Sequence, residues 1–436
     1  MSNPSLTRDQ LVSGYFESGK PRAAFRVGAE FERHLLRNDG SPLPYFGTPG
    51  VGWLLERLAG QRGWEPYVEG GHLIALQRGM ESVTLEPGSQ FELSGSPFRT
   101  IAEVEAEARA FALEVQEALV GTNVSQVALG YSPFTRIEDV SWVPKGRYVV
   151  MRDFLGRTGD LAHSMMKGTA AVQATYDYSD EIDCARKIRL ATLLGPLTTG
   201  MFANSPWVQG RPSGYLSWRG KIWTRTDPAR TGFPAAASAF TFERWVDWLL
   251  QVPMMFKKDR QGAWQFARGQ TFGEWMEDGT AGPTAADWEL HLTSVFPEVR
   301  VKRAIEIRGA DCVPLPLAMG FAAFWKGLYY DESSLELALG VAERFASEGT
   351  SADRFETACR LGLEGRVGTR TMASWAEELV DLADAGLERV CPDDRRWLAP
   401  LQRQVASGES PARTLLRRLG EHPSPLALVA ATPMVD

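Results

Sequence analysis

Pairs of polar side chains recur two residues apart in segments that alternate like β-strands. Glu30 and Glu32 have this spacing in the segment 25–33, and Glu306 and Arg308 have it in the segment 300–308. Side chains two apart project from the same face of a strand. Like charges at this spacing repel unless a cation or a basic side chain offsets them. Carboxylate oxygens select hard cations, so these pairs of polar side chains predict a site for Mg²⁺ or Mn²⁺ rather than zinc.

Two further segments carry the same pattern of alternate polar residues. These rows are Glu86, Gln90 and Glu92, and Gln173, Thr175 and Asp177. The first row shares one face only if its strand continues through Pro87 and Gly88 without a bulge. Four solvated sheet faces whose carboxylates never meet are the alternative interpretation. Because four separate strands show the pattern, we favour convergence on one metal site.

Nucleotide chemistry in this chain would need an unusual phosphate site. The sequence contains neither G-x-x-x-x-G-K-[ST] nor G-x-G-x-x-G. Phosphates would therefore be held by metal-bound carboxylates and by arginines, which grip phosphate or carboxylate through paired hydrogen bonds. A surface ion pair is the alternative for each basic residue. The candidates are Lys145, Arg147, Arg219, Arg230 and Arg308.

The elements that must position these residues follow from hydrophobic periodicity. Strands are predicted at 25–33, 72–78, 81–93, 124–131, 170–177 and 300–308. Helices are predicted at 7–19, 100–120, 183–195, 240–251, 334–346, 353–362 and 372–389. Thr100 and Glu103 fit a capping box at the start of the second helix. We expect an α+β protein with a mainly antiparallel sheet, forming a single domain over 1–436 whose part after about residue 315 is mostly helical.

Composition narrows the class of protein. The chain has 436 residues, 44% hydrophobic and 23% charged, with a net charge of −7. This is typical of a soluble globular protein, and the acidic balance does not support nucleic-acid binding. The start of the chain lacks the basic-then-apolar order of a signal peptide, and the longest uncharged run, 190–210, contains Gly and Pro, which favours a buried helix over a membrane span. The four cysteines lie far apart. We expect a cytoplasmic location.

Seven motifs in order resemble those of glutamate–cysteine ligases of the plant and proteobacterial type. They cover most of the chain up to residue 311. The motifs are GAEFE at 28–32, LEPGSQFELSG at 85–95, PKGRY at 144–148, FANSP at 202–206, IWTRTDPARTG at 222–232, HLTSVFPEVR at 291–300 and IEIRGAD at 305–311.

The resemblance implies a fold related to glutamine synthetase, a curved antiparallel sheet that forms a funnel flanked by helices. It implies that ATP phosphorylates the γ-carboxylate of glutamate and that the amine of cysteine then attacks, giving γ-glutamylcysteine, ADP and phosphate. The metal ligands carried over for Mg²⁺ or Mn²⁺ are Glu30, Glu32, Glu86, Glu92 and Glu306, with Gln173 at the matching position on its strand. By the resemblance, Arg147 and Arg219 would bind substrate carboxylate or transferring phosphate. Among the other basic candidates, we expect Arg308 to act in catalysis and Lys145 and Arg230 to bind the nucleotide.

The sequence departs from the family pattern close to the expected substrate strand. Gly168 stands where Arg is expected, Thr175 where Asn is common, and Cys312–Val313 where the plant type has a Gly pair. No cysteine pair is placed like the regulatory disulfides of the plant enzymes. Three hypotheses therefore remain: glutamate–cysteine ligase, a related γ-glutamyl ligase that uses a different amino acid or amine, and a catalytically silent relative that binds nucleotide or amino acid. The retained carboxylates argue against the third, because a buried acidic cluster is costly without a cation. The oligomeric state is left open.

Overall fold

One antiparallel sheet organises the molecule. The computed structural model describes residues 6–60, 62–259, 261–278 and 282–435, and within them nine strands form this sheet. Its order is β14-β15-β7-β1-β5-β4-β3-β2, and β6 pairs with the end of β1. The strands are β1 (Val27–Arg37), β2 (Glu65–Glu69), β3 (His72–Arg78), β4 (Glu81–Leu85), β5 (Phe91–Ser94), β6 (Val124–Val127), β7 (Ala171–Tyr176), β14 (Val299–Val301) and β15 (Ile305–Asp311). The sheet is not closed into a barrel, since its ends β14 and β2 do not pair with each other among the described residues.

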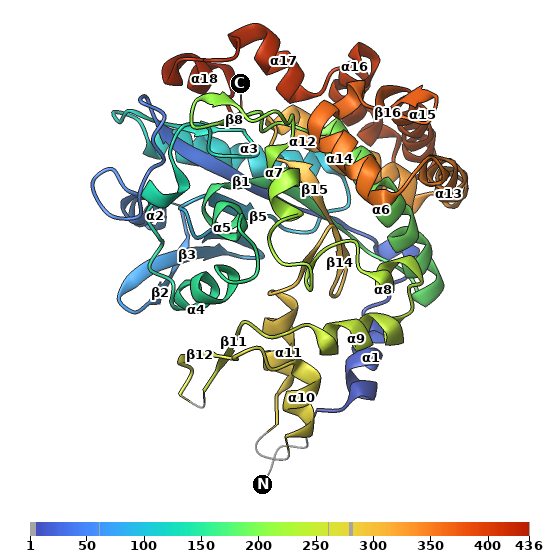
Figure 1. Cartoon of the computed structure of the whole chain (residues 1–436), viewed down its shortest axis with the longest axis horizontal. Coiled ribbons are helices and arrows are strands. Elements are labelled where there is room, and N and C mark those ends of the chain that lie inside the picture. The colour runs from blue at the N-terminus through green and yellow to red at the C-terminus, as the bar shows by residue number, and fades with distance from the viewer. Residues whose placement is uncertain (1–5, 61, 260, 279–281, 436) are drawn as a thin grey trace.

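Strand β1 holds the centre of the sheet and crosses the middle of the molecule (Figure 1). Its alternate residues Val27, Ala29 and Phe31 are buried and apolar, whereas Glu30 and Glu32 between them are half-buried. Burying a large apolar side chain stabilises the fold by about 1.5–3 kcal/mol. A slip of one residue would exchange the two faces, so the apolar residues fix the register and thereby the face that carries the glutamates.

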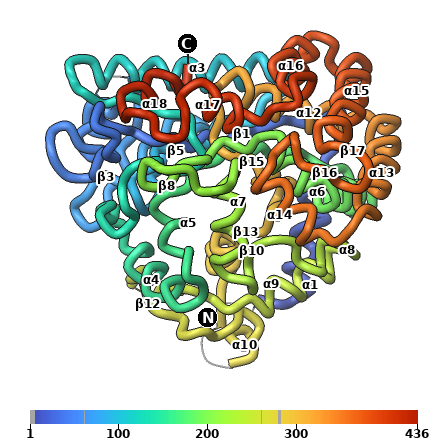
Figure 2. The backbone as a smooth tube through the Cα atoms, turned by 45° about the horizontal axis from the view of Figure 1, so that its top comes forward, coloured from blue at the N-terminus to red at the C-terminus, as the bar shows by residue number. Residues whose placement is uncertain are grey.

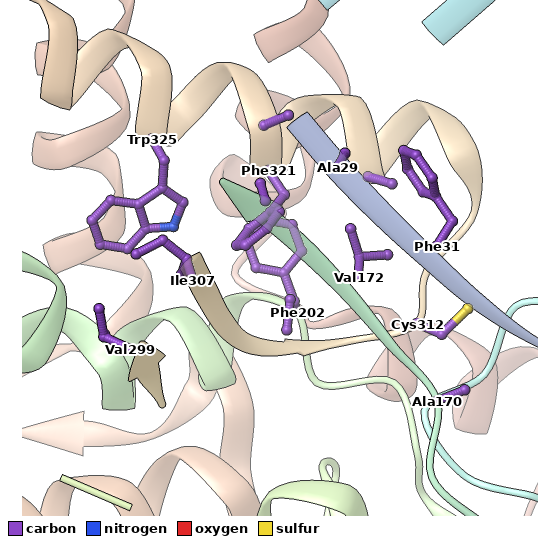
Figure 3. Close-up of a cluster of buried hydrophobic side chains, with 14 of the residues drawn as sticks. Ala29, Phe31, Ala170, Val172, Phe202, Val299, Ile307, Cys312, Phe321 and Trp325 are labelled. Carbon is purple, nitrogen blue, oxygen red and sulfur yellow. The ribbon is translucent and has the colours of Figure 1, made fainter. Parts of the chain in front are cut away.

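Helices cover the apolar face of the sheet. In Figure 3, Phe321 and Trp325 of α12 (Leu315–Tyr330) lie in one cluster with Phe31 of β1, Val172 of β7 and Ile307 of β15. α12 also packs against α15 (Met372–Val390). The main cluster of buried apolar side chains extends from Leu11 to Val435. The polar face of the central strands is therefore the one left for a site.

The remaining elements surround this sheet. The other α-helices are α1 (Arg8–Glu17), α2 (Val51–Ala59), α3 (Ile101–Ala118), α4 (Gly146–Leu155), α5 (Ala162–Gly168), α6 (Glu181–Met201), α7 (Trp218–Trp223), α8 (Ala235–Ser238), α9 (Phe242–Gln251), α10 (Phe272–Glu277), α11 (Ala285–Leu292), α13 (Glu332–Ser347), α14 (Ser351–Leu361), α16 (Ala399–Ser407), α17 (Pro411–Leu419) and α18 (Pro425–Ala431). Short two-stranded sheets join β8 (Trp207–Val208) to β9 (Arg211–Pro212), β10 (Thr231–Gly232) to β13 (Phe296–Pro297), β11 (Phe256–Lys258) to β12 (Trp264–Phe266), and β16 (Arg366–Val367) to β17 (Arg370–Thr371). Figure 2 shows α13 and α15–α18 along the top and right of the molecule, away from α4 at the lower left.

Most predicted elements are confirmed. The α+β class with a mainly antiparallel sheet is correct, and each predicted helix is present. Thr100 and Glu103 form the expected capping box at α3. No helix in the described part of the chain is both long and apolar enough to cross a membrane. The cysteines are all free thiols, three of them buried.

Two segments predicted as single strands are hairpins instead. The segment 81–93 divides into β4 and β5, which pair with each other so that Thr84 lies opposite Glu92. The chain reverses at Glu86–Ser89, where the Ser89 amide donates to the Glu86 carbonyl at 2.9 Å and Ser89 has φ +72°. Proline in this turn cannot donate to a sheet ladder, which is why the strand stops there. The segment 300–308 divides likewise into β14 and β15.

The turn between β4 and β5 removes Gln90 from the predicted polar row. Its side-chain amide donates to the carbonyls of Met166 at 3.2 Å and Thr169 at 2.8 Å. A Cβ at Gly88 would lie 2.2 Å from the Lys167 carbonyl oxygen, so glycine is needed for this close approach. Gln90 therefore fastens the turn to the end of α5.

The buried histidine of α11, His291, is expected to make the stability of the fold depend on pH. His291 of α11 shares a hydrogen bond of 2.9 Å with the Leu249 carbonyl of α9, and burial lowers the pKa of His291 to about 4. An unfolded histidine titrates near pH 6.5. Because the folded state disfavours protonation of His291, the contribution of this residue to stability is fully present above about pH 6.5. That contribution is lost as the pH falls toward about 4.

We therefore expect the wild-type free energy of unfolding to fall by about 2 kcal/mol more than that of His291→Gln between about pH 7.5 and about pH 5. Urea unfolding at the two pH values measures this difference. His422→Gln, a change at an exposed histidine, is the control and should lose as much as the wild type. An equal loss in wild type and His291→Gln would show that His291 is charged in the fold.

Candidate active site

The register of the central strands brings the predicted polar rows together. Glu30 of β1 lies directly opposite Gln173 of β7, and Glu32 of β1 lies directly opposite Glu92 of β5. Directly opposite residues have Cβ atoms about 5 Å apart on one face of the sheet. Three segments that are far apart in the sequence therefore place their carboxylates and amide side by side.

This polar face lines a cavity of about 250 Å³. Its acidic lining consists of Glu30, Glu32, Glu86 and Glu92, and its basic lining of Arg147, Arg219, Arg300 and Arg308. The other walls are largely apolar, with Met151, Met165, Met166, Trp223, Phe256 and Phe296. A cavity that combines both signs of charge with apolar side chains suits a ligand with anionic groups and an apolar part.

Two of the four carboxylates are held by hydrogen bonds. Glu32 accepts from the Ala171 amide at 2.7 Å and from the Gln173 side chain at 3.2 Å. Glu92 accepts from the hydroxyls of Thr84 at 2.6 Å and Ser94 at 3.2 Å. Among the described residues, the carboxylate of Glu30 has no hydrogen-bond donor. Glu30 therefore has its oxygens available for a ligand.

Burial and mutual repulsion disfavour ionisation of these carboxylates. Burial, followed by the charges of Glu306 and Glu92, raises the pKa of Glu30 to about 8. Burial and the charges of Glu86 and Glu92 raise the pKa of Glu32 well above its usual value. Burial and Glu92 likewise raise the pKa of Glu86. A cation in the cavity would favour the charged forms of all three.

The carboxylates do not form a complete metal cage by themselves. No group of three or more His, Cys, Asp or Glu side chains in the described ranges lies close enough to hold one ion. The donor set nevertheless fits Mg²⁺ or Mn²⁺, because these ions accept carboxylate and amide oxygens and take their remaining ligands from substrate phosphates and water. Glu30, whose carboxylate has no hydrogen-bond donor among the described residues, is available to bind such a cation.

Arg147 and Arg219 present donors to the cavity. Arg147 lies in the first turn of α4, and Arg219 lies in the first turn of α7. The Nε atoms of both are buried and have no hydrogen-bond partner in the described structure. An unpaired buried donor is costly, and an anionic substrate group would satisfy it.

Glu306 and Arg308 form a charge cluster behind the carboxylates. Arg300 binds Glu306 through two hydrogen bonds of 3.0 and 2.7 Å, and Arg308 bonds to Glu306 and to Gln173. Although burial alone would raise the pKa of Glu306, the charges of Arg300, Lys302 and Arg308 hold it well below its usual range. Glu306 is therefore ionised but occupied by arginines, and it does not line the cavity. Metal binding by Glu306 would require it to leave Arg300.

Two residues expected to bind nucleotide lie outside the cavity lining. Lys145 donates to the Leu85 carbonyl at 3.2 Å, and the Tyr148 hydroxyl donates to the same oxygen at 2.5 Å, so both fasten the turn that carries Glu86. Arg230 is fully buried and pairs with Asp227 at 2.6 Å. It also donates to the carbonyls of Ser294 and Pro253. Lys145 thus fastens the end of β4 beside Glu86, and the guanidinium of Arg230 is bonded to acceptors of the protein itself.

A known protein family matches most of the chain. The sequence profile of glutamate-cysteine ligase family 2 (GCS2) matches residues 26–431. The chain belongs to this family. It is a carbon–nitrogen ligase, as the motifs predict.

Plant enzymes are among the similar proteins. The chain is 37% identical to the chloroplastic glutamate–cysteine ligase of Brassica juncea over 423 residues, which are 94% of this chain and 80% of the relative. It is 36% identical to the enzyme of Nicotiana tabacum, over 94% of this chain and 79% of the relative. The glutamate–cysteine ligase B of Oryza sativa subsp. japonica is 35% identical, over 95% of this chain and 84% of the relative.

Solved structures share the fold. The glutamate–cysteine ligase of Francisella tularensis, solved in complex with AMP, superposes with a TM-score of 0.58 at 12% identity, over 94% of this chain and 87% of that one. A bifunctional glutathione synthetase from Pasteurella multocida gives a TM-score of 0.55 at 14% identity, over 93% of this chain and 51% of that one.

The expected cytoplasmic location is contradicted by the relatives, whose names describe them as chloroplastic. The expectation rested on the lack of a secretory pattern at the start of the chain. That pattern reports only export through the secretory route, and import into an organelle uses different signals.

Several residues of the cavity were not predicted from the sequence. Thr84 reaches Glu92 because β4 pairs with β5, and Arg300 reaches Glu306 because β14 pairs with β15. The family motif at 291–300 contains Arg300, so its spacing of six from Glu306 is the one local signal for that pair. The apolar walls from α4, α5 and α7 have no such signal, since these helices are short and irregularly patterned.

Two of the departures from the family pattern, Gly168 and Thr175, adjoin residues of the cavity lining. A Cβ at Gly168 would lie 2.5 Å from the ring of Tyr131, so a larger side chain at 168 would displace that ring. Gly168 follows Met165 and Met166 of the cavity wall and precedes Thr169, which also lines it. Thr175 lies opposite Glu306 in the sheet. These positions keep the identity of the acceptor amine open.

Proposed function

We propose that this protein is an ATP-dependent ligase that joins the γ-carboxylate of L-glutamate to the amine of L-cysteine, giving γ-glutamylcysteine, ADP and phosphate. The observation that carries the proposal is the convergence of four glutamates and four arginines in one cavity of the family's fold. Glutamate and ATP are both anionic, so a site that joins them needs cations of its own as well as carboxylates for a metal. We also propose that residues 1–436 act as one catalytic unit.

The reaction proceeds in two steps. The γ-carboxylate oxygen of glutamate forms a bond to the γ-phosphorus of ATP while the bond to the β–γ bridging oxygen breaks, which releases ADP. The amine nitrogen of cysteine then forms a bond to the acyl carbon, the C–O bond to phosphate breaks, and the nitrogen loses a proton. Phosphorylation is needed because oxide is a very poor leaving group from a carboxylate.

The residues of the cavity divide this work. Arg147 and Arg219 bind the phosphoryl group and the substrate carboxylate, and Arg308 adds positive charge beside Gln173. Glu30, Glu32, Glu86 and Glu92, with Gln173, would hold one or more divalent ions. Mg²⁺ or Mn²⁺, when bound, would offset the negative charge of the phosphates and stabilise the charge that develops during transfer. The apolar walls exclude water from the acyl phosphate.

A γ-glutamyl ligase that uses a different amine is the second candidate. The observation that favours it is the position of two departures from the family pattern: Gly168 precedes Thr169 of the cavity lining, and Thr175 lies two residues beyond Gln173 on β7. Release of ADP with glutamate, ATP and a panel of amines separates the candidates. Turnover that depends on cysteine supports the first function, and turnover with another amine supports the second. An absence of turnover with every amine would contradict both and favour a binding protein.

Divalent cations are expected to be essential. Excess EDTA should lower the rate of ADP release by at least about 10²-fold, because the anionic reactants then repel each other and the carboxylates without compensation. Added Mg²⁺ or Mn²⁺ should restore the rate. Full turnover in EDTA after extensive dialysis would contradict the metal site.

A further inference from the structure

A buried carboxylate outside the cavity lies at the centre of a hydrogen-bond network. Asp311 is the last residue of β15 and is 1% exposed. One of its carboxylate oxygens accepts from the Ser205 hydroxyl at 2.6 Å and from the Asn204 amide at 2.8 Å. The other accepts from the Ser217 hydroxyl at 2.9 Å. Asp311 therefore binds two segments that lie about a hundred residues away in the sequence.

The two hydroxyls carry the network into the first turn of α7. The Ser205 hydroxyl accepts from the backbone amide of Arg219 at 3.0 Å. Ser217 is the N-cap of α7, and its hydroxyl accepts from the amide of Gly220 at 3.0 Å. Both amides at the start of the helix are thus tied to Asp311 through one serine each.

The same strand also holds the guanidinium of Arg219. The pairing of β15 with β7 shifts register between Ile307 and Ala310. At this irregularity the Arg308 carbonyl accepts from Nη2 of Arg219 at 2.9 Å. Oδ1 of Asp311 lies 3.8 Å from Nη1 of Arg219. β15 therefore fixes both the backbone and the side chain of an arginine that lines the cavity.

A carboxylate suits this position better than an amide. Asp311 accepts three hydrogen bonds from three donors, and the side-chain amide of Asn can accept on one oxygen only. Space is tight as well, because a Cβ at Gly130 would lie 2.5 Å from the carboxyl carbon of Asp311. A substituted side chain would have to move the donors or be moved by them.

We propose that Asp311 is a positioning residue that sets the place of Arg219 in the cavity. The inference rests on the proposed function, in which Arg219 binds the transferring phosphoryl group or the substrate carboxylate. A shift of about 1 Å in such a group can reduce the rate by about 10²-fold. Asp311 itself does not line the cavity, so it would act through Arg219.

A double-mutant cycle tests this role. Asp311→Asn should lower kcat by about 10- to 100-fold with wild-type Arg219. In the Arg219→Ala background the same substitution should change kcat by less than about 2-fold, because the group that it positions is already gone. A purely structural carboxylate would lower kcat equally in both backgrounds, and that result would overturn the inference. If Asp311→Asn does not fold, Ser217→Ala takes its place in the cycle, with the same expected pattern.

Asp394 is a matched control. It is fully buried and accepts from the Ile101 amide at 3.0 Å and from Lys326 at 2.6 Å, in a network that does not touch the cavity. Asp394→Asn should lower the melting temperature and leave kcat per folded molecule unchanged. The assays also separate the levels of the proposal. No turnover in the wild type would overturn the proposed function, and full activity of Arg219→Ala would remove Arg219, and with it Asp311, from catalysis.

Discussion

Glu30→Gln is expected to lower kcat by about 10³-fold or more, the largest effect of any single substitution in the carboxylate set. Glu30 lines the cavity, lies opposite Gln173 and has no hydrogen-bond donor among the described residues. An amide keeps the size of the side chain but binds a divalent ion far more weakly. Steady-state release of ADP with saturating glutamate and cysteine measures the loss.

The same substitution should not damage the fold. Burial and the charges of Glu306 and Glu92 already raise the pKa of Glu30 to about 8, so the neutral amide removes a charge that the metal-free fold disfavours. We expect the melting temperature of the metal-free variant to equal or exceed that of the wild type.

Glu114→Gln is the control for Glu30. Glu114 is buried, but it binds Arg78 and Trp64, and none of the three lines the cavity. Removing its charge should destabilise the protein by about 1–3 kcal/mol and leave kcat unchanged. Full activity in Glu30→Gln would take Glu30 out of the metal site.

Arg147→Met is expected to reduce kcat/KM by about 10²- to 10³-fold. The guanidinium lines the cavity, its Nε has no partner, and no carboxylate of the described residues lies within 4.0 Å of it. A guanidinium with unpaired donors in a cavity suits an anionic substrate group, which it would bind through charge-assisted hydrogen bonds. Methionine keeps much of the side-chain volume and removes the charge.

The control for Arg147 lies on the same helix. Arg152 of α4 is exposed and packs over the ring of Trp142 at 5.2 Å. Arg152→Met should change kcat/KM by less than about 2-fold, since a solvated charge contributes little. The melting temperature of Arg147→Met should not rise, because the guanidinium also offsets the charges of Glu86 and Glu92 in the same cavity. Equal kinetic losses in the two variants would show a general effect of charge rather than a binding site.

Much of the fold could be predicted from local patterns. Alternation in β1 and the apolar periodicity of α3, α9, α13 and α15 are visible in the sequence because each element must bury one face. Both failures in the strands occur at hairpins. Strand pattern continues on both sides of the turn at 86–90 and of the turn at 302–304, so periodicity alone cannot show where the chain reverses.

The candidate site was predicted in part for the same reason. Glu30 and Glu32 share one face of β1 because the side chains of a strand alternate with a period of two. The pairing of β1 with β5 then places Glu92 opposite Glu32 on that face. Glu306 was grouped with them by the same rule, yet Arg300 and Arg308 occupy it. Lys145 and Arg230 were assigned to the nucleotide by residue type, and their partners Leu85 and Asp227 became visible only in the structure.

The sequence by itself determined which side chains can do chemistry and, through its ordered motifs, the family to which the chain belongs. The sequence also determined which face of β1 is buried. A register that exposed the apolar face to solvent would lose the free energy of its burial. Only the tertiary structure decided which charges meet. Contacts such as Glu306 with Arg300 or Asp311 with Ser205 depend on strand pairing and helix packing. The local pattern of residues therefore does not determine them.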